Sequence, residues 1–253
     1  MLFDTHAHLN SDRFGQDRDA VIAALPEQGV DLVMEVGTST EDNPQVLALV
    51  ERYDFIYGAV GWHPHEAKDA PDDMEQSLRQ WASHPKVRAI GEIGLDYLYD
   101  FSPRDKQREI FERQLYVAQQ LKLPIILHER KAHQDTLTVL SGLVGGISGV
   151  CHCYSGSIET GRILLDMGLY IGFTGMVTFK NAHRLQSVAA WAPLEWLVIE
   201  TDCPYMAPEP YRGQRNIPSY VRQVGEKIAE LKGISAEEVF AVTMENGRRL
   251  FGI

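Results

Sequence analysis

The chain has 253 residues, of which 44% are hydrophobic and 23% are charged, a composition typical of globular proteins. Its net charge of −11 argues against a broad electrostatic grip on duplex DNA, because that grip depends on Lys and Arg side chains that neutralise phosphates. The three cysteines, Cys151, Cys153 and Cys203, show no disulfide-framework spacing, which indicates a reducing, cytoplasmic compartment. We expect neither a secretory signal nor a membrane-spanning segment, because no apolar run is long enough.

Short apolar runs rich in β-branched residues recur along the chain, and the segments between them have helical spacing of apolar residues. One such helix is predicted over residues 104–123, with Ser102 as its N-cap and Pro103 as its first residue. Residues 235–252 predict an extra helix at the C-terminal end. The eight predicted strands lie at about residues 1–6, 31–37, 56–62, 87–93, 124–128, 148–153, 170–174 and 196–201.

Buried strands that alternate with helices predict an α/β fold with a parallel sheet. Eight units of roughly 30 residues nearly fill the chain, which is the size of a (β/α)8 TIM barrel. We therefore predict one such barrel, a single domain over residues 1–253. A doubly wound open sheet is the alternative, and the number of strands favours the barrel only mildly.

Histidines and carboxylates gather at the ends of the predicted strands, where a (β/α)8 barrel builds its active site. Glu92, Glu200 and Asp202 lie at such ends. Six of the nine histidines do so too: His6, His8, His63, His65, His128 and His152. Imidazoles and carboxylates are ligands of divalent transition metals. The pattern predicts a metal centre at the mouth of the barrel.

The spacing of His6 and His8 places both side chains on one face of the first strand. Asp202 comes from the last strand, which closes beside the first, so these three side chains can reach one ion. Glu92 comes from the fourth strand and can bridge to a second ion. His128 and His152 can complete that second site. A bridge of this kind between ions ~3.5–4 Å apart is typical of two-metal hydrolases.

The same alternation predicts that the cysteines are not ligands. Cys151 and Cys153 flank His152, so we expect their side chains to point away from it and to pack as small hydrophobic groups. Cys203 is expected to pack in the same way.

The combination of motifs resembles the TatD family of metal-dependent deoxyribonucleases, which are amidohydrolase-like metallohydrolases. The resemblance extends over nearly the whole chain. The strongest features are "GEIGLDY", "GWHPH" and "TDCPYMAP" followed by "RGQRN", together with "DTHAHL", "ILHER" and "CHCYSG".

This resemblance implies a barrel with two divalent ions, for which Zn²⁺, Mn²⁺, Ni²⁺ and Mg²⁺ are the candidates. The implied ligands are His6, His8, Glu92, His128, His152 and Asp202. The implied activity is hydrolysis of DNA phosphodiester bonds from the 3′ end.

Three residues are the predicted catalytic groups for this chemistry. Asp202 ligates an ion and can accept a proton from the attacking water, and Glu92 bridges the ions. His63 can hold the phosphate or protonate the leaving oxygen, because the pKa of histidine is near neutral.

Further residues are candidates for binding the substrate. Arginine forks match phosphate oxygens, which favours Arg130, Arg212 and Arg215, with Asn216 beside them. His65 is a weaker candidate, since it can equally shape the loop around Pro64. Four aromatic residues near strand ends can stack on bases or pack in the core: Trp62, Tyr97, Tyr154 and Tyr205.

The predicted substrate is a DNA 3′ end or a short single strand, because few phosphates need to be held; no membrane and no obligate protein partner is implied. The main alternative is a metal-dependent hydrolase of a small ester, lactone or amide, whose metal centre would look the same. Arg130, Arg212 and Arg215 lining one groove would favour DNA, and their absence from it would favour the small substrate. A non-catalytic binding module is the third interpretation.

Overall fold

A computed structural model describes all residues, 1–253, and contains one sheet of eight parallel strands in chain order. The strands are β1 (Leu2–Ala7), β2 (Val30–Val36), β3 (Ile56–Val60), β4 (Val87–Asp96), β5 (Ile125–Arg130), β6 (Gly149–Cys151), β7 (Leu169–Phe173) and β8 (Leu197–Ile199). All eight predicted strands are present. The predicted barrel is confirmed, and the open-sheet alternative is wrong.

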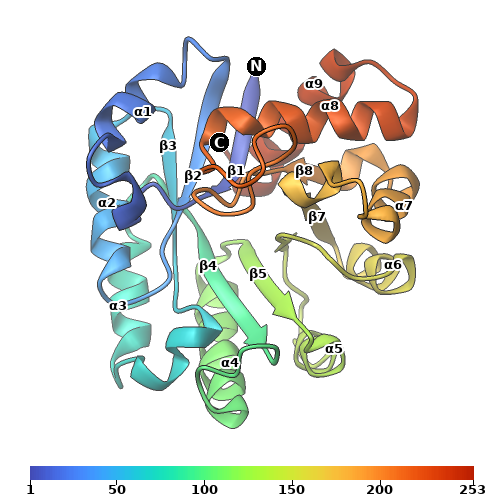
Figure 1. The fold of residues 1–253 in the computed structure, drawn as a ribbon. Coiled ribbons are helices and arrows are strands. Elements are labelled where there is room, and N and C mark those ends of the chain that lie inside the picture. The colour runs from blue at the N-terminus through green and yellow to red at the C-terminus, as the bar shows by residue number, and fades with distance from the viewer.

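Helices surround the strands in Figure 1. They are α1 (Arg18–Ala24), α2 (Asp42–Arg52), α3 (Met74–Trp81), α4 (Arg104–Leu121), α5 (His133–Ser141), α6 (Ile158–Asp166), α7 (His183–Trp191), α8 (Val221–Lys232) and α9 (Ala236–Phe251). Helix α9 is the predicted extra helix, and the Ser235 side chain caps it by accepting the backbone N–H of Glu238. No helix combines the length and the apolar character that crossing a membrane requires.

The start of α4 differs from the prediction. Pro103 is the N-cap, and Ser102 caps nothing. The buried Ser102 hydroxyl instead donates to the carbonyl of His65 and accepts the backbone N–H of Lys68. This side chain therefore joins the β4–α4 connection to the loop after β3, a contact that local sequence does not reveal.

The barrel closes where β1 meets the chain after β8. Ala7 and Cys203 form a parallel bridge, and the backbone N–H of Asp202 donates to the carbonyl of His6 at 2.9 Å. The buried carboxylate of Asp4 accepts the backbone N–H of Thr201 at 2.8 Å and its hydroxyl at 2.5 Å. These contacts, which we call the seam, bring the two ends of the sheet together.

Two apolar clusters follow from the alternation of side chains along the strands. The larger lies between barrel and helices and includes Ile125 and Leu127 of β5. The smaller includes Ile126 between them and fills the interior, with Phe3 from β1 and Phe251 from α9 in edge-to-face contact. Helix α9 thus packs against the inner cluster and leaves the carboxyl ends of the strands free for chemistry.

Candidate metal centre

The first ligand group lies where β1 ends. The Nε2 atoms of His6 and His8 are 3.1 Å apart, and both rings are buried. Glu92 Oε2 lies 3.4 Å from His6 Nε2 and 3.8 Å from His8 Nε2. Asp202 Oδ1 lies 3.8 Å and 3.4 Å from the same two nitrogens. Bonds of ~2.1 Å to a tetrahedral ion give ligand separations of ~3.4 Å, so His6, His8 and Glu92 fit a single divalent cation, and Asp202 lies beside the two imidazoles.

The second ligand group lies on the other oxygen of Glu92. Oε1 is 2.7 Å from His128 Nδ1 and 2.8 Å from His152 Nε2. One carboxylate therefore faces two separate sets of nitrogens, one with each oxygen. The geometry brings together all six side chains that the sequence pointed to, and groups of them can hold a metal ion.

Hydrogen bonds from the outer ring nitrogens orient two of the imidazoles. The Nδ1 of His8 lies 2.9 Å from the carbonyl of Val36, and the Nε2 of His128 lies 3.1 Å from Asp96 Oδ2. These acceptors place a proton on the outer nitrogen of His8 and of His128, so that the inner nitrogen of each ring would offer its lone pair to a bound ion. The Nδ1 of His152 forms no hydrogen bond, and the nearest carboxylate oxygen is Glu200 Oε1 at 3.5 Å.

His63 has the opposite arrangement. Its Nε2 is 3.2 Å from His128 Nδ1 and 3.6 Å from Glu92 Oε1, close enough to belong to the second group. However, its Nδ1 accepts the backbone N–H of His65 at 3.1 Å. The neutral ring then carries its proton on Nε2, which makes this atom a hydrogen-bond donor that faces the cavity.

Burial and charge together give the centre its electrostatics. Burial raises the pKa of Glu92, but His152 and His63, with the hydrogen bond from His128, hold it well below its usual range. Burial lowers the pKa of His8, yet the hydrogen bond and charge of Asp202 raise it to about 9. The carboxylates are therefore ionised, and a divalent cation that binds His8 would displace the proton that this raised pKa keeps on its ring.

Asp96 is a further candidate site residue, to which the sequence alone assigned no role. Its Oδ2 lies 3.1 Å from His128 Nε2 and 3.0 Å from His65 Nε2. Its Oδ1 accepts the backbone N–H groups of Leu98 and Tyr99. Asp96 follows Glu92 by four residues within "GEIGLDY", so its strand position was a signal that could have been used.

Glu200 holds the backbone next to His152 in place. It is fully buried, and its Oε1 accepts the backbone N–H of Cys153 at 2.5 Å beside His152. A Cβ on Gly172 would lie 2.7 Å from the other oxygen of Glu200, so only glycine leaves room for this carboxylate. The sequence placed Glu200 at a strand end but assigned it no task.

The prediction that Cys153 points away from the site and packs as a small hydrophobic group is wrong. Strand β6 ends at Cys151, and Cys153 has a φ of 46°, so side chains stop alternating before this residue. Its Sγ lines the cavity, 3.7 Å from Thr174 Oγ1 and 3.8 Å from Met206 Sδ. Cys151 and Cys203 are buried in the larger apolar cluster, as expected.

A cavity of about 960 Å³ opens above the metal ligands. Arg130 and His65 line it. So do seven carboxylate residues, which make its wall strongly acidic: Asp12, Glu41, Asp42, Glu66, Glu92, Glu129 and Asp202.

Three of the predicted phosphate-binding residues do not line this cavity. Arg215 pairs with Asp17 at 2.6 Å and 2.7 Å. Asn216 is fully buried, and its amide donates to the carbonyls of Thr201 and Tyr205. The guanidinium of Arg212 lies 4.3 Å above the Phe179 ring. Such contacts hold the loop after β8, which carries Asp202, in place.

The four aromatic candidates separate into two kinds. Trp62 and Tyr154 are buried, and the hydroxyl of Tyr97 donates to Asp135. Tyr205 is 48% exposed and lines the cavity. Only Tyr205 among these four is placed to meet a substrate.

Comparison with known proteins agrees with this geometry. The family described as TatD related DNase matches residues 3–252. The chain belongs to the TatD family. The uncharacterized metal-dependent hydrolase YabD of Bacillus subtilis is 44% identical over 100% of both chains. The 3'-5' ssDNA/RNA exonuclease TatD of Salmonella typhimurium is 34% identical, over 100% of this chain and 99% of its own.

A solved structure is similar over its full length. The TatD homologue YjjV of Escherichia coli superposes with a TM-score of 0.93 at 31% identity, covering 100% of this chain and 98% of that one. The family, the barrel and the ligand cluster together make this TatD-family chain a metal-dependent hydrolase.

Proposed function

We propose that this TatD-family hydrolase cleaves phosphodiester bonds at the ends of nucleic-acid strands, with two divalent ions that share Glu92. The observation that carries the proposal is the division of Glu92 between two nitrogen sets, Oε2 toward His6 and His8 and Oε1 toward His128 and His152. A similar protein that bears the name of a 3'-5' ssDNA/RNA exonuclease supports the substrate class.

In this proposal His6, His8 and Asp202 would hold one ion, His128 and His152 would hold the other, and Glu92 would contribute one oxygen to each. Zn²⁺, Mn²⁺, Ni²⁺ and Mg²⁺ are the candidate ions. Bound divalent ions supply Lewis-acid chemistry, which makes water a better nucleophile and offsets charge on phosphate oxygens.

Side chains of the protein transfer the proton and bind the phosphate in this proposal. The carboxylate of Asp202, at the mouth of the barrel, accepts the proton that the attacking water loses. The Nε2–H of His63 faces the same space and donates a hydrogen bond to a phosphate oxygen. Arg130 carries no ion pair and lines the cavity, so its guanidinium is free to bind a second phosphate oxygen.

The acidic wall limits the form of the substrate. Seven carboxylates and a single arginine line the cavity, so a long polyanion is repelled wherever bound ions do not offset its charge. A strand end or a short single strand places few phosphates there. We propose such a substrate, with action from the 3′ end.

The same wall favours a second candidate, hydrolysis of a small neutral ester or lactone. Arg212 and Arg215 lie outside the cavity, as this alternative expects. A small ester needs only the metal centre and one orienting group, and it avoids the repulsion that a polyanion meets.

One experiment separates these candidates. Metal content is measured for wild type and Glu92→Ala, and both proteins are then assayed on 3′-labelled single-stranded DNA and on a panel of small esters and lactones. We expect shortening of the DNA by metal-loaded wild type alone. Intact DNA with turnover of a small ester would overturn the nuclease proposal, and equal cleavage by Glu92→Ala would identify a contaminating nuclease.

A further inference from the structure

One rim of the cavity carries exposed aromatic side chains. The loop between β4 and α4 leaves Leu98, Tyr99 and Phe101 exposed by 48%, 48% and 57%. The rings of Tyr99 and Phe101 stack, with centroids 5.4 Å apart and planes 24° from parallel. Asp96 holds the backbone of this loop, so the rings stand at a fixed place beside the metal ligands.

An arginine without a carboxylate partner accompanies Tyr99. The guanidinium of Arg130 lies 5.0 Å from the centre of the Tyr99 ring. It forms no ion pair in the structure, although the chain has an excess of acidic residues. An exposed ring with a free guanidinium on it matches a nucleotide, in which a flat base is attached to a phosphate.

The same combination occurs on the opposite rim. Tyr205, in the loop after β8, lines the cavity and is 48% exposed. The guanidinium of Arg13 lies 5.6 Å from the centre of its ring and forms no ion pair either. Strands β4 and β8 stand four positions apart in the ring of eight, so the two pairs face each other across the barrel.

The metal ligands lie between these two pairs. The Tyr205 ring is 6.3 Å from that of His8, in the first ligand group. The Tyr99 ring is 5.6 Å from that of His65, which shares Asp96 with His128 of the second group. A phosphate bound at the ligands would therefore have one exposed tyrosine on each side.

We infer that Tyr99 and Tyr205 are stacking platforms for the two nucleobases that flank the scissile phosphate. Arg130 and Arg13 bind the phosphates next to those bases. The inference rests on the proposed nuclease function and adds how the substrate is held. Stacking gives affinity without sequence preference, because every base has a flat face, and it avoids the repulsion that the acidic wall imposes on phosphates.

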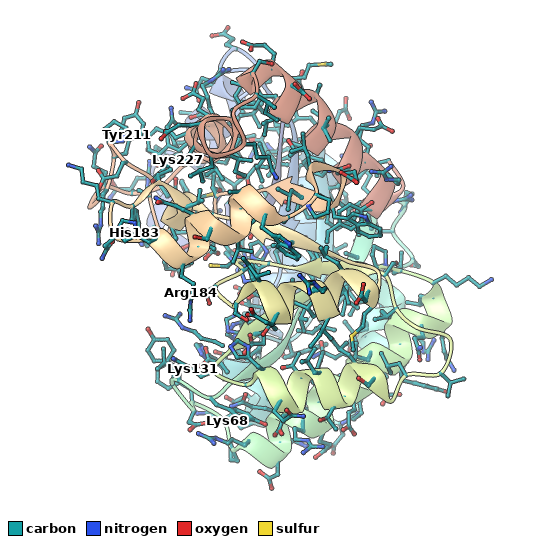
Figure 2. All side chains as sticks on the ribbon, turned by 90° about the vertical axis from the view of Figure 1, so that its right-hand side faces the viewer. Lys68, Lys131, His183, Arg184, Tyr211 and Lys227 are labelled. Carbon is teal, nitrogen blue, oxygen red and sulfur yellow. The ribbon has the colours of Figure 1, made fainter.

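Cations on the outer rim are consistent with this arrangement. Lys68, Lys131 and Arg184 lie along the left edge of Figure 2, on the same side of the molecule as Tyr211 of the loop after β8. They follow β3, β5 and β7, at the carboxyl ends of these strands. A nucleic-acid strand that extends out of the acidic cavity thus meets positively charged side chains outside it.

The test uses dinucleotides in which one base is replaced by hydrogen. Dithymidylate with a further phosphate at each end, its two single-base analogues and the base-free analogue with the same phosphates are assayed with metal-loaded wild type, Tyr99→Ala and Tyr205→Ala. We expect each substitution to raise KM for one single-base analogue by about 5-fold to 100-fold, with the two substitutions affecting different analogues. The kcat and the metal content stay unchanged, and Tyr→Phe at either position restores KM.

Matched controls separate stacking from general damage. Tyr116→Ala removes an exposed tyrosine on the outer helix α4 and leaves every KM unchanged. Arg130→Gln and Arg13→Gln raise KM for all four dinucleotides, whether or not a base is present. Equal KM values for wild type and both Tyr→Ala variants would overturn the inference alone, as would an equal rise for the base-free analogue. If wild type cleaves no dinucleotide and no labelled strand, the proposed function fails as well.

Discussion

At the scale of single residues, the outer ring nitrogens of the candidate ligand histidines decide how their inner nitrogens could bind an ion. The proton on the outer nitrogen of His8 or His128 decides which lone pair points inward, and a carbonyl or Asp96 decides where that proton lies. His63 stands beside the same ligands with the opposite tautomer, because a backbone N–H occupies its Nδ1. Proximity alone would therefore misassign it as a ligand.

The contact between Asp96 and His128 can be tested by Asp96→Asn. An amide has one acceptor oxygen, so it cannot accept the backbone N–H groups of Leu98 and Tyr99 and also face both imidazoles, as the two carboxylate oxygens do. The lone pair of His128 Nδ1 is then less well directed. We expect the affinity for the ion that His128 would hold to fall about 10-fold to 100-fold. The measurement is metal release to a competing chelator.

The control for this substitution is Asp100→Asn, which removes an exposed carboxylate from the same loop. It should leave metal affinity unchanged. If Asp96→Asn and wild type release metal at the same chelator concentration, the orienting role assigned to Asp96 is wrong.

At the scale of elements, strand ends and the loops after them deliver the chemistry. His6 lies in β1, and His8 follows directly after that strand ends at Ala7. Strands β6 and β8 likewise end before His152 and Asp202. Those two ligands therefore depend on loops held by other contacts, such as the amide of Asn216 on the carbonyl of Thr201.

Strand β1 can be tested by the double substitution His6→Ala with His8→Ala. Both rings lie at the mouth rather than in the apolar interior cluster, so we expect the fold to persist while metal is lost. Circular dichroism should match wild type, and elemental analysis should show the metal-to-protein ratio reduced by at least half. Full metal occupancy in this variant would refute the assignment of β1.

The ion pair between Arg215 and Asp17 is expected to stabilise the loop after β8, and the pH dependence of stability can test this. The hydrogen bond from Arg215 lowers the pKa of Asp17 below its usual 3.8. A lowered folded-state pKa stabilises the fold above the unfolded value, and this stabilisation is lost as the pH falls through the folded one. Wild type should therefore unfold at a higher temperature than Arg215→Ala at pH 7, and the difference should shrink below about pH 4.

Arg212→Ala is the matched control, since Arg212 forms no ion pair and contacts the Phe179 ring. Its difference in melting temperature from wild type should not depend on pH in this range. A difference for Arg215→Ala that stays constant from pH 7 to pH 3 would rule out the ion pair as its cause.

At the scale of the whole molecule, the two ends of the barrel have different roles: one end contributes to stability, and the other carries the residues for chemistry. Helix α9 packs against the interior cluster, and the six candidate ligands lie at the carboxyl ends of the strands. The seam between β1 and the chain after β8 serves both, since it closes the barrel and sets His6 beside Asp202.

The seam can be tested by Thr201→Val, which keeps the side-chain shape and removes the hydroxyl. This change removes one donor from the buried carboxylate of Asp4. Loss of a partner by a buried polar group costs about 1–3 kcal/mol, so the free energy of unfolding should fall by that amount in urea titration. Thr138→Val, whose exposed hydroxyl bonds within its own helix, should change it far less. An unchanged stability in Thr201→Val would show that the seam does not depend on this bond.

The sequence by itself determined the order of the eight strands and the six candidate ligands at their ends. Both follow from local patterns, because buried strands are apolar runs and parallel strands present their carboxyl ends on one side. Its interpretation of Cys153 and Ser102 was wrong, because a positive φ and a contact with the loop after β3 override local rules.

Only the tertiary structure decided which polar residues serve the site and which hold the fold. Arg215 pairs with a residue 198 positions away, and Glu200 reaches Cys153 across 47 positions. No spacing along the chain predicts such pairs, since they form only when the barrel closes. The same closure sets Tyr99 and Tyr205 on opposite rims of one cavity.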